Sequence, residues 1–270
     1  MAMAVVEGTA TLDRSLGRIF AVVGVFDGLH RGHAYLLGEL HSAAAAHDAR
    51  PAVITFDHHP DEVLQGAAPP LLCDPGERLD RLAAAGVEVT VIETFDRALR
   101  ETTYDTWVGR IVDHVELAGL LMTPESAFGY ERGGTPATVA ELGRSLGFEV
   151  VVVPQFTLDG APVRSSDIRA AIAAGDLARA ERLLGRRVSI VGTVRSTAGD
   201  VTELGFELPV ALPPPGRYEA LVRDAGGALR AHTLEVSDGR VAITPATPAG
   251  TGARVGIELV RGASATIRRS

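Results

Sequence analysis

Residues 24–33 read Gly24-Val25-Phe26-Asp27-Gly28-Leu29-His30-Arg31-Gly32-His33. The stretch follows an apolar run, Ile19–Val23, whose length and β-branched content predict a buried strand. It precedes Ala34–Leu40, whose apolar residues have helical spacing. The sequence therefore predicts a glycine-rich turn that leads from a strand directly into the first turn of a helix.

The beginning of that helix is a candidate anion site. A helix N-terminus offers unpaired backbone N–H groups and the positive end of the helix dipole. Gly24, Gly28 and Gly32 allow the backbone to come close to a bound group. His30 and His33 are three residues apart and share one helix face. Two imidazoles beside an anion site suit a reaction that builds negative charge on a phosphate.

Two plainer interpretations of these histidines are open. In the first, the stretch is a strand-turn-helix unit with incidental histidines. In the second, the histidines bind zinc, but a zinc site needs three or four ligands, and the single cysteine, Cys73, provides no cluster. We therefore expect no bound metal cage at this position.

Composition narrows the class of protein. The chain has 270 residues, a formal charge of −8 and 46% hydrophobic residues, so it can form one large domain or two ordinary ones. The acidic balance without a basic run argues against nucleic acid as a partner. No apolar stretch is long enough to span a bilayer, and no secretory signal is evident. One cysteine fits a reducing cytoplasm, so we expect a cytoplasmic protein with no membrane partner.

The first two thirds of the chain alternate between two patterns. Apolar segments with strand character are separated by helical patterns, which predicts a doubly wound α/β fold with a parallel sheet. The predicted strands are 19–25, 51–56, 87–93, 117–122 and 148–153, and the helices are 32–48, 75–85, 103–116 and 135–147. Ligands of such sheets bind outside the carboxyl ends of the strands, where the 24–33 turn lies.

The pattern changes after residue 185. Residues 164–184 predict two helices, the second with Asp176 as its N-cap and Gly185 as its C-terminal stop. Beyond them, short alternating segments predict a small all-β barrel. These segments are 187–194, 203–210, 217–223, 230–236, 240–244 and 254–260, with turn signals that include 224–227 and 237–239. We expect two domains, residues 1–185 and 186–270.

The 24–33 stretch resembles the GxFDGxHxGH signature of the nucleotidylyltransferase superfamily. Its Phe-Asp-Gly form looks most like the adenylyltransferase module of prokaryotic FAD synthetases. In that family the two histidines stabilise the phosphate under attack, and no covalent enzyme intermediate forms. The resemblance implies catalytic roles for His30 and His33, and a nucleotide pocket lined by Gly24, Val25, Phe26, Asp27 and Gly32. For Asp27, shaping of the loop is favoured over contact with the ligand.

A second motif lies at residues 163–169. Ser165 is a candidate N-cap, and Arg169 lies one turn further on the same face as Ser165 and Ser166. The stretch resembles the family signature Ile-Ser-Ser-Thr-x-x-Arg, with Arg164 in the place of the first serine. The resemblance implies that the two serines bind nucleotide and that Arg169 takes part in catalysis by holding the β- and γ-phosphates. Plain helix capping is the alternative.

Two further stretches resemble the flavin-binding parts of the family. Residues 55–64 resemble Thr-Phe-Asp-Pro-His-Pro, in which Asp57 and His59 would orient nucleotide or flavin groups; a turn that caps the next helix is the alternative. Residues 123–134 align with a loop that commonly reads Gly-x-Asp-Phe-x-Phe-Gly. Glu125 stands for the aspartate and Phe128 is kept, whereas the first aromatic residue is replaced by Ser126.

The C-terminal segment resembles the family's riboflavin kinase barrel only in part. The kinase motif Gly-Arg-x-Leu-Gly-Phe-Pro-Thr-Ala-Asn is reduced to Leu204-Gly205-Phe206, and the threonine and asparagine that would bind Mg²⁺ and phosphate are missing. We therefore expect a degenerate barrel without riboflavin kinase activity.

Together these resemblances imply an FMN adenylyltransferase that converts ATP and FMN to FAD and pyrophosphate with the help of Mg²⁺. Three alternatives remain open: another phosphorylated acceptor, a non-catalytic flavin- or nucleotide-binding protein, and a kinase activity that survives the loss of its motif. The sequence does not indicate the oligomeric state.

Overall fold

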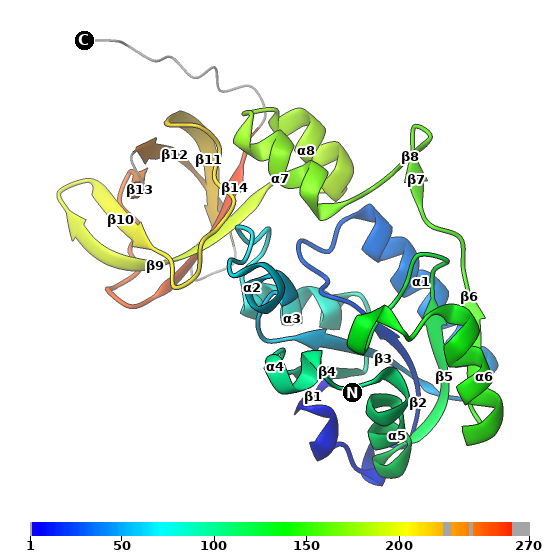
Figure 1. Ribbon diagram of the computed structural model, residues 1–270. Helices are drawn as coiled ribbons and strands as arrows, with labels where there is room; N and C mark the ends of the chain where they lie inside the picture. Colours follow the sequence, from blue (N-terminus) through cyan, green and yellow to red (C-terminus); the bar gives the residue numbers. More distant parts are fainter. Residues whose placement is uncertain (1, 224–227, 238–239, 261–270) are drawn as a thin grey trace. The chain divides into compact units, whose positions relative to one another are not determined.

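The computed structural model describes residues 2–223, 228–237 and 240–260 (Figure 1). The chain divides into two compact units, the first formed by Met1–Pro69 with Arg78–Pro162 and the second by Pro70–Glu77 with Val163–Ser270. The predicted turns at 224–227 and 238–239 lie outside the described residues. The predicted domain boundary between residues 185 and 186 stays a prediction.

The first unit contains a six-stranded sheet in which every neighbouring pair is parallel. The strand order is β1-β4-β3-β2-β5-β6. The strands are β1 (Ala4–Glu7), β2 (Arg18–Val23), β3 (Arg50–Phe56), β4 (Val89–Glu93), β5 (Glu116–Met122) and β6 (Glu149–Val152). From β2 the chain moves outward through β3 and β4 and then returns to β5 on the other side of β2. The switch point of this doubly wound sheet is therefore at β2, directly before the glycine-rich turn.

Helices cover both faces of the sheet (Figure 1). They are α1 (Arg31–Ala46), α2 (Pro60–Gln65), α3 (Pro75–Ala84), α4 (Arg97–Arg100), α5 (Tyr104–His114) and α6 (Pro136–Leu146). Short 3₁₀ turns occur at η1 (Thr9–Thr11), η2 (Arg14–Leu16) and η3 (Tyr130–Arg132). All five predicted strands and all four predicted helices of this part are confirmed, with ends that differ by a few residues.

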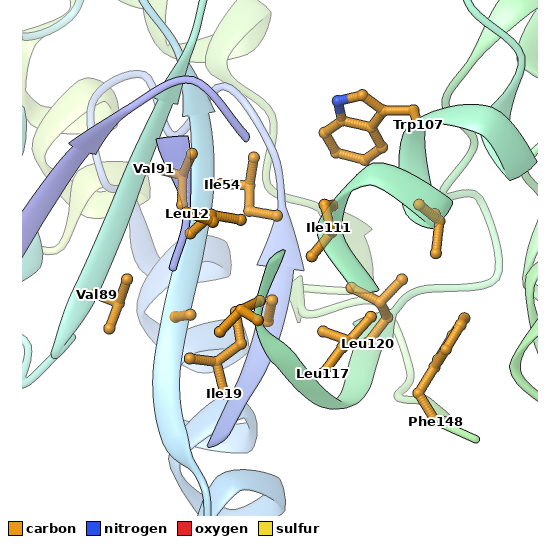
Figure 2. Packing of buried hydrophobic residues seen from close by; sticks show 14 of the residues in the cluster. Leu12, Ile19, Ile54, Val89, Val91, Trp107, Ile111, Leu117, Leu120 and Phe148 are labelled. Carbon is orange, nitrogen blue, oxygen red and sulfur yellow. The ribbon is translucent and has the colours of Figure 1, made fainter. Parts of the chain in front are cut away.

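The core has two halves because successive side chains of a strand point to opposite faces. Ile19 of β2 packs with Trp107 and Ile111 of α5, and this half is shown in part in Figure 2. The neighbouring Phe20 packs on the other face with Leu40 of α1 and with α3. All five side chains are at most 4% exposed. This two-sided burial explains why the strands read as continuous apolar runs.

Five strands and α-helices of the first unit were not predicted, namely β1, α2, α4, β7 and β8. β1 is a four-residue strand that pairs with β4 at the edge of the sheet, and only half of its residues are partly covered. α2 and α4 have six and four residues, too few for a helical pattern to stand out. A two-stranded hairpin, β7 (Thr157–Leu158) and β8 (Ala161–Pro162), ends the unit.

The second unit contains two helices and a closed six-stranded antiparallel barrel. The helices are α7 (Ser165–Ala173) and α8 (Leu177–Leu184), and the predicted Asp176 cap and Gly185 stop of α8 are confirmed. The barrel strands are β9 (Ser189–Ala198), β10 (Val201–Gly205), β11 (Gly216–Arg223), β12 (Leu229–Ser237), β13 (Arg240–Thr244) and β14 (Arg254–Leu259). They close in the order β10-β13-β12-β11-β14-β9, so the predicted barrel is confirmed.

The segment 70–77 is part of the second unit. Its Leu71 pairs with Val210 through two backbone hydrogen bonds, from Leu71 N–H to Pro209 O and from Ala211 N–H to Leu71 O. The predicted strand 203–210 is therefore too long, because β10 ends at Gly205 and the chain beyond it leaves the barrel to pair with this segment. Two side-chain contacts add to the pairing, between Asp74 and Arg254 and between Glu77 and Ser189. Helix α3 begins within this segment and continues into the first unit.

Within the described part of the chain, we find no helix with the length and apolar character needed to cross a membrane.

Candidate active site

The turn after β2 has an unusual backbone. Gly24 extends the strand by donating its N–H to Ile54 O at 3.0 Å. Phe26 and Leu29 then adopt left-handed φ values of 52° and 37°, which cost free energy for residues with a side chain. Phe26 is held in this conformation by burial, because its ring is 1% exposed and packs in the core cluster beneath α1. The predicted turn is confirmed, and the buried side chain of Phe26 holds it in place.

His30 and His33 lie against each other at the beginning of α1. His30 is the N-cap, and its Nδ1 accepts the backbone N–H of His33 at 3.3 Å. The two rings stack with 3.7 Å between centroids and 16° between planes. Gly32 is the second residue of the helix, and Asp27 is buried in the turn before it. The structure thus brings the two predicted catalytic histidines into direct contact.

Burial keeps both imidazoles neutral near pH 7. Loss of hydration lowers the pKa of His30 to about 4. The pKa of His33 is well below its usual value because of burial and, secondarily, the repulsive charge of His30. Since His30 Nδ1 accepts a hydrogen bond, the proton of the neutral ring is on Nε2. His30 is therefore a neutral N–H donor, whereas Nδ1 of His33 is buried without a hydrogen-bond partner among the described residues.

Two buried side chains hold the carbonyl groups beneath the turn. Val25 O accepts Thr55 Oγ1 at 3.0 Å and Nη1 of Arg78 at 3.2 Å. Nη2 of Arg78 donates to Phe56 O at 2.7 Å. Thr55 is 0% and Arg78 is 8% exposed. Sequence reasoning missed both residues, since nothing in the sequence distinguishes Arg78 from Arg81 on the same helix.

A cleft of about 740 Å³ opens beside the turn. Its walls include five residues that the sequence analysis assigned to nucleotide or flavin binding, namely Gly24, Val25, His59, Glu125 and Phe128. The cleft also contains the exposed side chains of Arg100 and Arg132, which the sequence analysis did not single out. Its size falls within the range of about 300–1,000 Å³ that is typical of small-ligand sites.

Asp57 and His59 have structural tasks at the ends of β3 and β4. Asp57 Oδ1 accepts the backbone N–H groups of His58 at 2.7 Å and of Phe95 at 3.1 Å. Burial raises the pKa of the Asp57 carboxyl, but these hydrogen bonds together with one from Thr94 outweigh that effect and hold the pKa below its usual value. His59 is the N-cap of α2 and also lines the cleft, whereas Asp57 is not one of the lining residues.

Phe128 forms a rigid part of the cleft wall. Its ring meets the indole of Trp107 edge to face, with 5.3 Å between centroids. Its carbonyl accepts the N–H of Gly134 at 2.9 Å, which closes the 128–134 loop. A side chain at Gly134 would meet Cβ of Tyr104 at 2.7 Å, so this loop requires glycine where it crosses α5. Nε1 of Trp107 is buried and has no hydrogen-bond partner among the described residues.

The second predicted motif lies in the other unit. Ser165 and Ser166 are the first residues of α7, and Arg169 follows one turn later. The prediction of Ser165 as N-cap is wrong, because Arg164 is the last extended residue and helical geometry begins at Ser165; the cap has no side-chain hydrogen bond. Arg169 donates from Nε to Pro70 O at 2.8 Å, within the second unit. Ser165, Ser166 and Arg169 therefore belong to the second unit, whereas the two histidines belong to the first.

Among the described residues, no three histidine, cysteine, aspartate or glutamate side chains come together as a metal-binding group. Mg²⁺ in nucleotide enzymes usually keeps several waters and is held by one or two carboxylates plus the substrate phosphates, so a protein cage is not required for it. A magnesium ion held mainly by the phosphates of a bound nucleotide would therefore need no metal-binding group of this kind.

The fold and the site define a class of protein. The first unit is a doubly wound α/β domain with a glycine-rich turn, a helix N-terminus and a cleft of about 740 Å³ at the carboxyl edge of its sheet. This is the edge at which α/β domains bind nucleotides and their phosphates.

Comparison with known proteins identifies the family. A family model described as FAD synthetase matches residues 13–167, and the chain belongs to this family. It is 31% identical over 194 residues to a bifunctional riboflavin kinase/FMN adenylyltransferase of Haemophilus influenzae, covering 71% of this chain and 63% of that protein. It is 31% identical over 203 residues to the protein of the same name from Escherichia coli K12, covering 74% and 64%. The matched part spans slightly less than two thirds of these relatives.

A solved structure has a similar fold. A protein from Streptococcus pneumoniae described as a macrolide-efflux protein superposes with a TM-score of 0.79 at 21% identity, covering 95% of this chain and 89% of that one. At this identity the similarity shows the fold alone.

Proposed function

We propose that this chain transfers AMP from ATP to FMN, giving FAD and pyrophosphate. Membership of the FAD synthetase family supports this activity, as do the relatives named for FMN adenylyl transfer. The observation that carries the proposal is the stacked, neutral pair of His30 and His33 at the beginning of α1, in the turn beside a 740 Å³ cleft.

The proposed reaction needs charge stabilisation more than base catalysis. An oxygen of the FMN 5′-phosphate forms a bond to the α-phosphorus of ATP, the bond from that phosphorus to the bridging oxygen of the β-phosphate breaks, and pyrophosphate leaves with the electron pair. The attacking phosphate is already ionised at neutral pH, so no side chain has to remove a proton. Positioning and stabilisation of the developing charge then supply the rate enhancement.

The residues of the first unit would divide this work. His30 would donate from Nε2 and His33 from its own ring to the α-phosphate, as neutral donors that leave the negative charge on the phosphate. Gly24, Val25 and Gly32 would bring backbone close to the nucleotide. The buried Phe26 and Asp27 would shape the turn.

The remaining ligand groups would be held elsewhere. Ser165, Ser166 and Arg169 would bind the β- and γ-phosphates, as the family signature implies. Phe128, Glu125 and His59 would contact the flavin in the cleft. Asp57 would support flavin binding indirectly, because it accepts backbone N–H groups from the loops that follow β3 and β4. Bound Mg²⁺ would neutralise the phosphates of ATP.

We further propose that the two halves have different tasks, with adenylyl transfer in residues 1–185 and a barrel without kinase activity in residues 186–270. The segment after Leu204-Gly205-Phe206 lacks the kinase threonine and asparagine. Backbone groups of that segment, at Pro209 and Ala211, are hydrogen-bonded to Leu71 of the same chain. A strand partner at this position supports a structural task for the barrel.

The setting of the proposed enzyme follows from composition. The only cysteine, Cys73, is buried and can form no disulfide within the chain, which supports a reducing compartment such as the cytoplasm. The formal charge of −8 supports small-molecule substrates over nucleic acid or an anionic membrane surface.

The deciding experiment offers the purified protein Mg²⁺-ATP with FMN in one tube and Mg²⁺-ATP with riboflavin in another. We expect FAD and pyrophosphate in stoichiometric amounts from FMN, and neither FMN nor FAD from riboflavin. Absence of FAD in the first tube would refute the adenylyl transfer, and FMN in the second would refute the loss of the kinase.

One observation favours a second candidate, a nucleotidylyltransferase with another phosphorylated acceptor. Ser126 lines the cleft where the family commonly has an aromatic residue, and its hydroxyl accepts the Thr123 N–H at 2.9 Å. A more polar wall suits a smaller or more polar acceptor than FMN. Pyrophosphate release with a panel of phosphorylated acceptors, but not with FMN, would identify this case, whereas binding without pyrophosphate release would identify a non-catalytic protein.

A further inference from the structure

We infer that Arg78 is a positioning residue for the proposed adenylyl transfer: from beneath the cleft, its guanidinium holds the Val25–Phe26 turn and the end of β3 in the geometry that receives the nucleotide. This inference rests on the proposed function. It adds a residue that is not in any of the motifs of the sequence.

Arg78 joins the ends of two neighbouring strands. One terminal nitrogen donates to Val25 O, just beyond β2, and the other to Phe56 O, at the last residue of β3. A planar guanidinium presents these donors in a fixed fork, which a lysine ammonium cannot reproduce. The side chain is 8% exposed, so the contacts are made away from bulk water, where they are strongest.

The two carbonyls belong to residues that line the cleft, whereas Arg78 does not line it. Arg78 therefore acts through the backbone of Val25 and Phe56 and not by touching a ligand. Thr55 Oγ1 is the second donor to Val25 O, so this single carbonyl is held from two sides. The two donors together restrict the orientation of the peptide group that follows Val25.

The anchored peptide orients one N–H group. In a trans peptide the C=O and the following N–H point in opposite directions. Because Arg78 and Thr55 fix the direction of Val25 C=O, they also fix the direction of the Phe26 N–H, on the other side of the peptide. Phe26 has the strained φ of 52°, and a strained residue persists only where its surroundings over-determine it. We assign the Phe26 N–H as the donor that Arg78 presents to the nucleotide.

The kinetic test compares Arg78→Lys, Arg78→Met and Arg78→Ala with a matched control, Arg144→Met, which removes an exposed arginine from α6. We expect kcat/KM for ATP to fall about 30-fold or more in Arg78→Met, since a small misplacement of the reacting groups can cost up to about 100-fold in rate. Arg78→Lys should lie between Arg78→Met and wild type. Millimolar guanidinium should restore part of the activity of Arg78→Ala and leave Arg144→Met unaffected. Unchanged kinetics in Arg78→Met would overturn the inference.

Hydrogen exchange separates this inference from the proposed function. Amide exchange in peptides that cover residues 20–33 and 54–60 should accelerate about tenfold or more in Arg78→Lys, with barrel peptides unchanged. A wild-type protein that makes no FAD would refute the proposed function. The exchange result would still test whether Arg78 holds the Val25–Phe26 turn and the end of β3. Equal exchange in wild type and Arg78→Lys would overturn the positioning role of Arg78, whatever the activity. Uniform acceleration over the whole chain would overturn it as well, because it would indicate a general loss of stability.

Discussion

His30 caps the helix that His33 belongs to, through a 3.3 Å hydrogen bond from the His33 N–H to His30 Nδ1, while the two rings stack 3.7 Å apart. This hydrogen bond fixes both the tautomer of the His30 ring and the position of the His33 backbone. The cap also uses one of the N–H groups of the helix N-terminus. Whatever anion binds here meets a donor on the His30 ring in addition to the remaining backbone groups.

Replacement of His33 should reduce catalysis severely. We expect His33→Ala to lower turnover at least about 100-fold, the scale of one lost transition-state donor. The measurement is pyrophosphate release with saturating FMN and ATP. His114→Ala, which removes a histidine whose ring contacts Arg110 O within α5, is the matched control. A turnover near that of wild type would remove His33 from the mechanism.

Acid should destabilise the protein through His30. Its pKa is about 4 in the folded chain and about 6.5 when unfolded, so between these values the unfolded state binds more protons. The stability contributed by the neutral ring is complete above pH 6.5 and declines as the pH falls toward 4. The expected loss is about 2 kcal/mol between pH 7 and pH 5.

Urea unfolding of wild type and His30→Asn at these two pH values checks the effect. Asparagine keeps an acceptor for the cap, so only the titration is removed. The wild type should lose more stability on acidification than the variant does, and equal losses would contradict the prediction.

The stability contributed by His47 should depend on pH in the opposite direction to that of His30. The hydrogen bond of His47 to Glu149, 2.7 Å long, raises the pKa of His47, with the Ala43 carbonyl as a further cause. The stability from this pair is complete below the unfolded pKa of about 6.5 and is lost as the pH rises through the folded value. His47→Gln should therefore destabilise the protein more at pH 5 than at pH 9 in the same unfolding assay. A larger effect at pH 9 would show that the pair does not hold the proton.

Replacement of Arg169 should change the KM for ATP more than the KM for FMN. We expect Arg169→Ala to raise the KM for ATP about tenfold or more, because it removes a charged hydrogen-bond donor for the phosphates. The steady-state KM for each substrate is the measurement. Arg179→Ala, on the exposed face of α8, serves as control. An unchanged dependence on ATP would contradict a role of Arg169 in binding the phosphates.

Replacement of Phe128 should change the KM for FMN more than the KM for ATP. Loss of its ring removes a wall of the cleft and the contact with Trp107, so Phe128→Ala should raise the KM for FMN roughly 10-fold. Phe128→Leu should recover part of that loss. Trp107 is the only tryptophan of the chain, so quenching of its fluorescence by FMN gives an independent binding curve. Equal changes in the KM of both substrates would place the flavin elsewhere.

Two glycines should respond in opposite directions to the same change. At Gly119 of β5 a new Cβ would meet ring atoms of Phe20 at 2.4 Å and Glu149 O at 2.7 Å, so Gly119→Ala should cost about 1–3 kcal/mol. At Gly38, exposed on α1, nothing lies within 4 Å, so Gly38→Ala should stabilise the helix by up to about 1 kcal/mol. Thermal unfolding measures both. Similar effects at the two sites would contradict the packing argument.

Much of the fold was predictable, because the hydrophobic pattern of a long segment indicates whether it forms a helix or a strand. The strands that pair around β2 are apolar throughout, since both of their faces are covered. The edge strand β1 was not predicted because it has only four residues, of which two are partly covered. β10 was predicted too long because residues 206–210 keep a strand-like pattern although Val210 pairs with Leu71, 139 positions earlier in the chain. Pattern within one segment cannot reveal such a distant partner.

The sequence by itself determined the order of strands and helices, the turn at residues 24–33 and the family, because each depends on spacing along the chain. Only the tertiary structure decided which side chains act together. Burial lowered the pKa of His30 and His33. Packing put Arg78 beneath Val25 and Phe56, which come from different strands. Desolvation and contacts between distant segments exist only after the chain has folded, so the chemistry of the site, unlike its location, could not be derived from the order of residues.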